Sequence, residues 1–483
     1  MAVLSSDLIR QGASGVSTAY TIDQSIRFND NDSPYMYKAY SGAGNKKTFT
    51  TSFWMKIGNV TSARRGLVSF IQDVPLELYS ADNIRVFLFG SERLVTNRKL
   101  RDVSAWYHIV LRVDSTQVAA SDRIRLYING ERETDFSAES YPSQDATGNM
   151  WGSNLLQFGR TYGSSYYFDG YLSEIHYSDG YSYGPENFGE FNSNNIWIPI
   201  EFEGSYGTNG VYLKGQDSSA FGNDSSGNDN DFDNVFNLEA NDQVLDSPTN
   251  NFAVINSTHS TRTTSGAGSS HSVENGNLFQ QADSYSTSNY GTRPFTVQPL
   301  NRGKWYFEFE GNTEAGGGNL VHVAISEESA FYVAQGAQST NRYGLYLESG
   351  SAMYVLYPGA SRQETNAPIA QYTKIIGCAT DFDNAKMYFF VDGTEIHGQD
   401  ISAGTAASNL SGWSTSSNWI FHFASVVASN NSARSNIVFN FGQEGTFIGT
   451  QSAGGNSDGN GIGNFKHSVP SGYLALCTSN LGS

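Results

Sequence analysis

The sequence has few cysteines, few prolines and few basic residues for its length. It holds 2 Cys and 11 Pro in 483 residues, and its 29 Lys and Arg are outnumbered by 47 Asp and Glu, which gives a net charge of −18. Two cysteines exclude a disulfide framework or a cysteine-rich zinc site. A nucleic-acid partner is not expected, because no basic run is present to neutralise phosphates.

Long apolar segments are missing as well. No run approaches the roughly 20 residues that a membrane-spanning helix needs, and Asp7 interrupts the N-terminus before the apolar core of a signal peptide can form. We therefore expect neither membrane insertion nor a secretion signal. Cys378 stands in the apolar run 375–379, which predicts a small buried thiol.

The chain is rich in glycine and aromatic residues. It contains 50 Gly, 13% aromatic residues and only 16% charged residues. Low charge disfavours helical bundles, whose exposed faces need Glu, Lys and Arg, and favours turn-rich β structure. The length suggests two to four domains. We expect an all-β protein.

Strand patterns fill two separate regions of the chain. In each half an apolar strand, an acidic turn, an aromatic-rich strand and a tight turn follow one another, and Asn129-Gly130 and Asp392-Gly393 are typical of two-residue hairpin turns. We therefore predict two related antiparallel sandwiches. The clearest strand patterns lie at 49–55, 84–89, 106–113, 123–128, 304–310, 321–325, 375–380 and 385–391.

Composition divides the chain into four parts. Residues 1–18 are a polar arm too poor in apolar side chains to fold alone, and 19–213 hold the first sandwich. Residues 214–300 are rich in Gly, Asn, Ser and Asp and are expected to be a connector. Residues 301–483 hold the second sandwich.

Several of these segments resemble known β-sandwich families. Residues 53–56 (Phe-Trp-Met-Lys), 126–131 (Leu-Tyr-Ile-Asn-Gly-Glu) and 168–174 (Phe-Asp-Gly-Tyr-Leu-Ser-Glu) resemble the laminin-G-like, concanavalin A-type jelly roll. Residues 303–308 (Gly-Lys-Trp-Tyr-Phe-Glu) and 376–384 look like parts of a SPRY-type sandwich. The resemblance implies two jelly-roll modules in series.

The order of the two modules, and the phrases that join them, resemble large structural proteins of tailed phages. The joining phrases are residues 206–213, 224–228 and 246–252. The resemblance implies a tail or capsid fibre that presents lectin-like domains to host-surface glycans, in a virion assembled in the host cytoplasm. Its expected partners are other virion proteins and further copies of itself, with a trimer as one option. The polar arm at 1–18 is expected to attach the protein to the particle or to these sibling chains. A purely structural decoration protein is the alternative.

The carboxylates do not form a catalytic pattern. A retaining glycosidase needs two carboxyl groups about 5 to 5.5 Å apart, and Glu308 and Glu310 share one face of a strand. The longer Glu-x-Asp-x-Glu pattern is absent, and the same stretch reads as an ordinary half-buried strand. We expect no catalytic residues and no enzyme activity.

The best candidate for saccharide contact is the loop at 161–167. Tyr162, Tyr166 and Tyr167 can stack on sugar rings, and the nearby Asp169 can bind hydroxyl groups. Packing between subunits or between domains is the alternative role for these rings. No cofactor is expected, although the resemblance to laminin-G-like domains allows calcium at Asp114 or Asp169.

Overall fold

The structure is a computed structural model. It describes residues 20–483 except 62, 149–154, 164, 260, 263–270, 283–288, 298, 314–319, 334–341, 349–351, 357–362, 365–373, 397, 408–409, 428–434 and 482–483. The predicted attachment arm, 1–18, lies outside the described residues.

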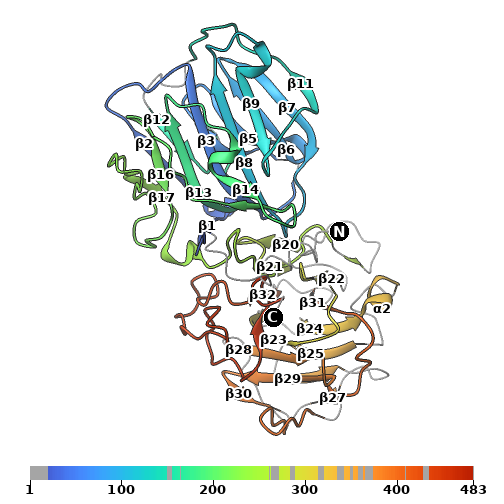
Figure 1. The fold of residues 1–483 in the computed structure, drawn as a ribbon. Helices are drawn as coiled ribbons and strands as arrows, with labels where there is room; N and C mark the ends of the chain where they lie inside the picture. The colour runs from blue at the N-terminus through green and yellow to red at the C-terminus, as the bar shows by residue number, and fades with distance from the viewer. Residues whose placement is uncertain are drawn as a thin grey trace. The chain divides into compact units, whose positions relative to one another are not determined.

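The chain forms two compact units, and both are built from mainly antiparallel sheets (Figure 1). The first sandwich comprises residues Gly15–Asn251 and the second comprises Phe252–Ser483. Among the described residues the one α-helix is α2 (Glu328–Val333). The all-β prediction is confirmed. No helix in the described part of the chain is long and apolar enough to cross a membrane.

The first sandwich has two large sheets, named here after a central strand. The β3 sheet has the order β10-β9-β8-β3-β13-β1-β18, with β16 beside β13, and the β4 sheet has the order β11-β7-β6-β5-β4-β12-β2-β17. The strands are β1 (Ser25–Phe28), β2 (Tyr35–Ala39), β3 (Thr48–Ile57), β4 (Arg65–Ser69), β5 (Val74–Tyr79), β6 (Asn83–Leu88), β7 (Ser91–Lys99), β8 (Trp106–Asp114), β9 (Ile124–Ile128), β10 (Glu131–Arg132), β11 (Phe136–Glu139), β12 (Leu155–Phe158), β13 (Gly170–Asp179), β16 (Val211–Leu213), β17 (Asn234–Phe236) and β18 (Gln243–Val244), with β14 (Gly189–Phe191) and β15 (Trp197–Pro199) forming a separate hairpin.

The second sandwich repeats this arrangement. Its β23 sheet has the order β30-β29-β28-β23-β32-β21-β20, with β33 beside β23, and its β24 sheet has the order β19-β22-β31-β24-β25-β26-β27. The strands are β19 (Thr261–Arg262), β20 (His271–Glu274), β21 (Phe279–Ala282), β22 (Asn289–Pro294), β23 (Lys304–Thr313), β24 (Leu320–Glu327), β25 (Arg342–Glu348), β26 (Ala352–Leu356), β27 (Gln363–Glu364), β28 (Ile375–Asp381), β29 (Lys386–Val391), β30 (Thr394–Glu395), β31 (Trp419–Val427), β32 (Ser435–Asn440) and β33 (Leu474–Ala475).

The two sandwiches therefore share a topology as well as a fold class. β3 lies between β8 and β13, and β23 lies between β28 and β32. In both sheets the central strand is therefore flanked by two strands that follow it in the chain. The two hairpin turns adopt positive φ at both central residues, 51° and 80° at Asn129-Gly130 and 46° and 76° at Asp392-Gly393. This backbone is the one that a two-residue hairpin of this type requires.

Alternating side chains build each core. Ile84, Val86 and Leu88 of β6 are buried while the residues between them are half-buried, as expected for a strand with one face inward. The first core is one continuous cluster of aliphatic and aromatic side chains, and the second sandwich has its own. Cys378 and Cys477 are both buried, and neither forms a disulfide bond. The burial of Cys378 agrees with the prediction.

The structure differs from the expected connector at 214–300. The described residues of this stretch belong to the two sandwiches: β17 and β18 extend the sheets of the first, and β19 to β22 are strands of the second. Phe221 and Phe232 are buried in the first core, and between them Asp224, Asn228 and Asn230 hydrogen-bond to backbone groups. Polar side chains order this segment because they pair with the backbone.

Candidate binding face of the first sandwich

The predicted tyrosine loop joins β12 to β13 and is held on the outer side of the β4 sheet. Its two ends are closed by the bridge between Arg160 and Tyr167. The backbone nitrogen of Tyr162 donates to Ser69 Oγ at 3.1 Å. Gly66 of β4 lies so close to the loop that an added Cβ would overlap the backbone nitrogen of Thr161. The loop is therefore fixed against the sheet.

The three predicted tyrosines all stand on this loop and are at least partly exposed. Tyr162 and Tyr166 are 39% and 38% exposed, and Tyr167 is half-buried. Large aromatic side chains held half-exposed on a fixed loop are suited to stacking on a ligand, because their rings keep one orientation without a large entropic cost.

Arginine side chains pack on these rings. The guanidinium of Arg64 lies 4.5 Å from the ring centre of Tyr166 and donates to the buried carboxylate of Glu77 at 2.8 Å. Arg85 donates to the same carboxylate at 2.7 Å. Glu77 thus anchors two guanidinium groups beneath the loop, and its own charge is neutralised there.

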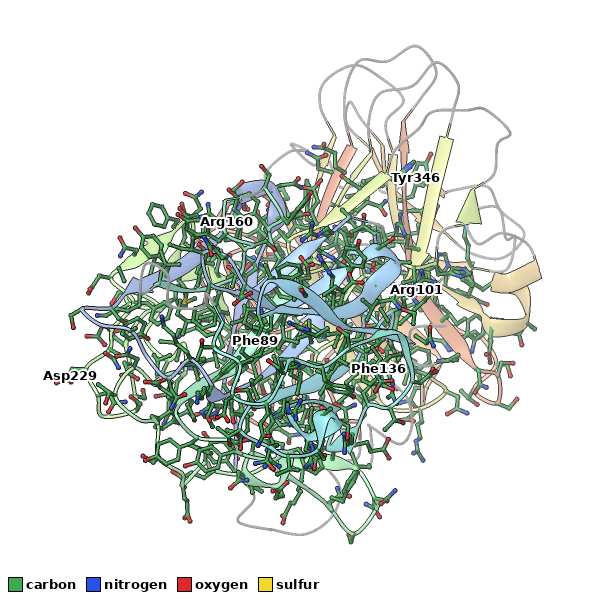
Figure 2. All side chains as sticks on the ribbon, turned by 90° about the horizontal axis from the view of Figure 1, so that it is seen from above. Phe89, Arg101, Phe136, Arg160, Asp229 and Tyr346 are labelled. Carbon is green, nitrogen blue, oxygen red and sulfur yellow. The ribbon has the colours of Figure 1, made fainter. Side chains whose placement is uncertain are left out.

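A second aromatic group continues this face toward the edge of the sheet. The guanidinium of Arg160, labelled in Figure 2, lies 3.7 Å from the ring centre of Tyr35. Tyr35 stacks on Phe236 of the edge strand β17 with a centroid distance of 4.6 Å, and Tyr167 lies 6.3 Å from Tyr35. Phe236 is 39% exposed. The tyrosine loop and the β17 edge therefore form one strip of rings and guanidinium groups, which we call the aromatic face.

Sequence reasoning found the tyrosines of this face but missed its other members. Arg160 stands directly before the loop, so its position in the sequence could have identified it as a member of this face. Tyr35 and Phe236 lie far away in the sequence and meet the loop through strand pairing of β2 with β17 and β12. No local sequence pattern predicts that these strands pair.

Asp169 does not lie on this surface, which corrects its predicted role in saccharide contact. Its side chain is fully buried, and Oδ2 accepts a hydrogen bond from Asn59 Nδ2 at 2.7 Å. Burial, and then the neighbouring Asp30, raise the pKa of Asp169 to about 7, while Arg65 lowers it. Asp169 directly precedes β13, and at the end of a strand the alternation of the sequence does not predict which way a side chain points.

The two calcium candidates lie at opposite ends of β3. Asp114 pairs in register with Thr48 at one end, and Gly170, the neighbour of Asp169, pairs with Ile57 at the other. Ten residues of strand span roughly 30 Å. Asp114 accepts hydrogen bonds from the Thr116 hydroxyl and the Gln117 amide and so closes its own turn. Among the described residues, no group of three or more His, Cys, Asp or Glu side chains is placed to hold a metal ion.

A Ser-His pair lies on the outer side of the β3 sheet. Ser52 Oγ and His108 Nε2 are 2.9 Å apart, and Trp197 Nε1 donates to His108 Nδ1 at 3.0 Å. An indole nitrogen only donates, so the neutral imidazole carries its proton on Nε2 and donates to Ser52. Burial lowers the pKa of His108 to about 3. This histidine is therefore not arranged to take a proton from the serine.

Glu174 and His176 lie near that pair and are equally enclosed. Glu174 Oε2 accepts from the hydroxyl groups of Tyr212 at 2.5 Å and Tyr20 at 2.8 Å. Ring stacking covers His176, whose centroid lies 4.2 Å from that of Tyr212. Glu174 has φ of 50° at an irregularity in the pairing of β13 with β3, which turns its side chain toward this cluster.

The carboxylates of β23 have structural partners. Glu308 accepts from the backbone nitrogens of Lys466 and His467, each at 2.8 Å. Glu310 accepts from Thr450 Oγ1 at 2.9 Å and from Gln451 Nε2 at 2.8 Å. Both side chains hold the C-terminal loops against the β23 sheet.

Comparisons with known proteins agree with the fold of the first sandwich. The family model described as the concanavalin A-like lectin/glucanases superfamily matches residues 29–180, so this part of the chain has a concanavalin A-like fold. No curated protein matches the chain.

Solved structures similar to the chain include proteins of several kinds. A Bacteroides ovatus protein described as carbohydrate-binding shares 16% identity and has a TM-score of 0.27; the match covers 40% of this chain and 56% of that one. The SPRY domain of human HERC1 shares 15% identity over 35% of this chain and 97% of its own, with a TM-score of 0.24. Domains LG4-5 of the mouse laminin alpha1 chain share 8% identity over 88% and 91%, with a TM-score of 0.26.

Proposed function

We propose that the chain is a non-enzymatic structural protein of a tailed-phage virion, a tail or capsid fibre whose first sandwich binds glycans on the host surface. The observation that carries the proposal is the aromatic face, in which two half-exposed tyrosines stand on a loop fixed to the β4 sheet. Tyrosine rings pack on the apolar faces of sugar rings, and guanidinium groups donate to their hydroxyl groups.

The expected affinity of one such face is low. Each ring contributes on the order of 1 kcal/mol by stacking. A fibre that carries several copies converts weak single sites into firm attachment, because the later binding events are intramolecular. The resemblance of the joining phrases to those of tailed-phage structural proteins supports placement on a virion, where many copies act together.

A decoration protein is the second candidate. The observation that favours it is the β17 edge, where Phe236 is 39% exposed and stacked on Tyr35. An edge strand with an exposed aromatic side chain is a natural place for another chain to pack. In that case the aromatic face contacts a neighbouring virion subunit and not a sugar.

Substitution of the exposed tyrosines by alanine tests the proposal. The double variant Tyr162→Ala/Tyr166→Ala removes two stacking surfaces, and single-site affinity for the host glycan is expected to fall about 10- to 30-fold. Tyr181→Ala is the matched control, since Tyr181 is 41% exposed on a different loop. Glycan-array binding and adsorption of purified protein to host cells are the measurements, with thermal stability as the check on folding.

Two results contradict glycan binding by this face. One is unchanged binding by the double variant. The other is a folded double variant that no longer incorporates into particles, which assigns the rings to subunit packing. Virions that lack the protein altogether contradict the virion assignment independently of the glycan result.

A further inference from the structure

A lysine, an aspartate and an asparagine meet on the outer side of the β3 sheet of the first sandwich, where all three are buried. Lys56 of β3 donates from Nζ to Asp246 Oδ2 at 2.7 Å and to Asn251 Oδ1 at 2.7 Å. Lys56 and Asp246 are fully buried and Asn251 nearly so. Lys56 and Asn251 stand 195 residues apart in the chain. An amine, a carboxylate and a carboxamide are thus held together without solvent.

The surroundings fix the orientation of each group. Trp106 Nε1 donates to Asp246 Oδ1 at 3.1 Å, and Asn251 Nδ2 donates to the backbone oxygen of Ser104 at 2.6 Å. The carboxamide therefore presents its oxygen, and with it the carbonyl carbon, to the amine. The ring of Tyr171 lies 5.7 Å from Nζ, and Trp106 and Tyr171 belong to one apolar cluster.

We propose that Lys56 and Asn251 form an intramolecular isopeptide bond, in an autocatalytic reaction in which Asp246 carries protons. Nζ of Lys56 attacks Cγ of Asn251, a new C–N bond forms, and the bond between Cγ and Nδ2 breaks. Nδ2 leaves as ammonia. The reaction exchanges one amide for another, so it needs no oxidant, reductant or cofactor.

The proton balance closes within the triad. Asp246 first takes one proton from the lysine ammonium, which frees the lone pair of Nζ. After the attack Nζ gives up a second proton, which passes through the carboxyl group of Asp246 to Nδ2. The departing ammonia finally accepts the proton left on Asp246 and leaves as ammonium. Asp246 returns to the carboxylate form.

Three properties of the site favour this reaction over a permanent ion pair. A nitrogen that is hydrogen-bonded to a carbonyl oxygen lies about 3.5 Å from the carbonyl carbon, which is close to the separation of reacting atoms in a near-attack arrangement. Desolvation lowers the pKa of Lys56, against the opposing effect of Asp246, and a desolvated lysine is an effective nucleophile. The buried carboxylate is placed to act as acid and base in turn.

The bond would tie the last residue of the first sandwich to its central strand. A force that pulls on the chain from residue 252 onward would pass through the crosslink into β3, and the residues between 56 and 251 would be shielded from it. Covalent closure of this kind suits a protein that holds a particle to a cell surface. The crosslink requires only the triad and is independent of the proposed function.

Mass spectrometry of the unmodified full-length chain is the decisive experiment. The intact mass under denaturing conditions is expected to be lower than the sequence mass by one ammonia molecule. Trypsin is expected not to cut after Lys56, and the digest is expected to contain one branched peptide that joins residues 48–64 to residues 215–262. The branched peptide is the required readout, since a succinimide at Asn129-Gly130 also loses ammonia but creates no branch.

Substitutions separate the bond from ordinary packing. Lys56→Met and Asp246→Asn are each expected to restore the full mass and the linear peptides. Asp82→Asn is the matched control, because it breaks a different buried ion pair of the same sandwich, Arg65 with Asp82, and is expected to keep the branch. Recovery of linear, unmodified peptides 48–56 and 215–262 from wild-type protein, after prolonged incubation in the folded state, overturns the proposal whether or not the variants fold.

Discussion

The two sandwiches share a topology but treat their buried charges differently. In the first, several buried charges face opposite charges: Arg65 lies 2.6 Å from Asp82, and Glu77 is held by two arginines. In the second, Glu308 and Glu310 accept hydrogen bonds from backbone, hydroxyl and amide groups. Arg293 likewise donates to Gln280 Oε1 at 2.8 Å and to the backbone oxygen of Ser257 at 2.8 Å.

This difference predicts whether a buried charge is affected more by a substitution or by a change in pH. An ion pair keeps both groups charged, so removal of one partner leaves the other charged and buried, at a high free-energy cost. Neutral partners satisfy hydrogen bonds without compensating the charge, so burial then shifts the pKa. Burial raises the pKa of Glu308 to about 7 and lowers the pKa of Arg293 to about 10. The ion pairs of the first sandwich are thus sensitive to substitution, whereas buried groups held by neutral partners, such as Glu308 and Arg293 in the second sandwich and Asp169 in the first, are sensitive to pH.

The largest effect is expected when a buried pair of the first sandwich is broken. Asp82→Asn removes the charge opposite Arg65, which is itself buried. The free energy of unfolding of the first sandwich is expected to fall by about 3 to 5 kcal/mol. Hydrogen exchange of the full-length chain, followed by peptide, measures the loss in residues 15–251 separately from residues 252–483.

Glu310→Gln is the matched substitution in the second sandwich. Its partners are a hydroxyl and an amide, so the loss of negative charge leaves no buried cation behind, and an effect within about 1 kcal/mol is expected. Equal losses for the two variants would remove the contrast between the sandwiches.

A somewhat smaller effect is expected from pH in the second sandwich. The pKa of Glu308 is raised from 4.5 to about 7, so the native state holds this proton more tightly than the unfolded state does. The resulting stability is fully present below pH 4.5 and is lost as the pH rises through 7, a change on the order of 3 kcal/mol. Unfolding of wild-type protein and of Glu308→Gln, compared at several pH values, measures it.

The slope with pH, and not the absolute stability, is the informative quantity. The carboxamide introduced by Glu308→Gln does not titrate, so the variant is expected to show a flatter profile between pH 4.5 and 7, whatever constant cost its amide carries beside the backbone N–H groups. The nearby His467 titrates in both proteins and cancels in the comparison. Parallel profiles would show that Glu308 has an ordinary pKa in the native state.

The sequence was sufficient for those features that are encoded locally. Alternation predicted the strands, and Asn129-Gly130 and Asp392-Gly393 predicted the turns, because the backbone at a two-residue turn is decided by those two residues. The repeated order of strand, acidic turn, strand and tight turn predicted the shared topology. Each of these signals lies within about 25 residues of chain.

Long-range contacts were not predictable in this way. Lys56 meets Asn251 across 195 residues, and Arg64 meets the ring of Tyr166 through the packing of the loop on the sheet. Asp169 was misplaced because period-2 alternation gives two faces but does not say which is inward at a strand end. The connector was misread because Phe221 and Phe232 are isolated among polar residues, and their burial depends on strands far away in sequence.

The smallest difference between the sandwiches is expected at their two equivalent hairpin turns. Gly130 and Gly393 both have positive φ, so alanine costs about 1 kcal/mol at either position. At Gly130 the added Cβ would also overlap the ring of Trp197, whereas at Gly393 the nearest atom is His467 Nδ1 at 3.1 Å. Displacement of Trp197 adds about 1 to 3 kcal/mol, so Gly130→Ala is expected to be the more destabilising. Gly90→Ala, where φ is 67° and nothing lies within 4 Å, isolates the backbone cost. Urea unfolding of the three variants measures the loss in the free energy of unfolding. Equal losses for Gly130→Ala and Gly90→Ala would show that the Trp197 ring moves aside at no cost. In that case alanine would be tolerated equally well at the turns of the two sandwiches.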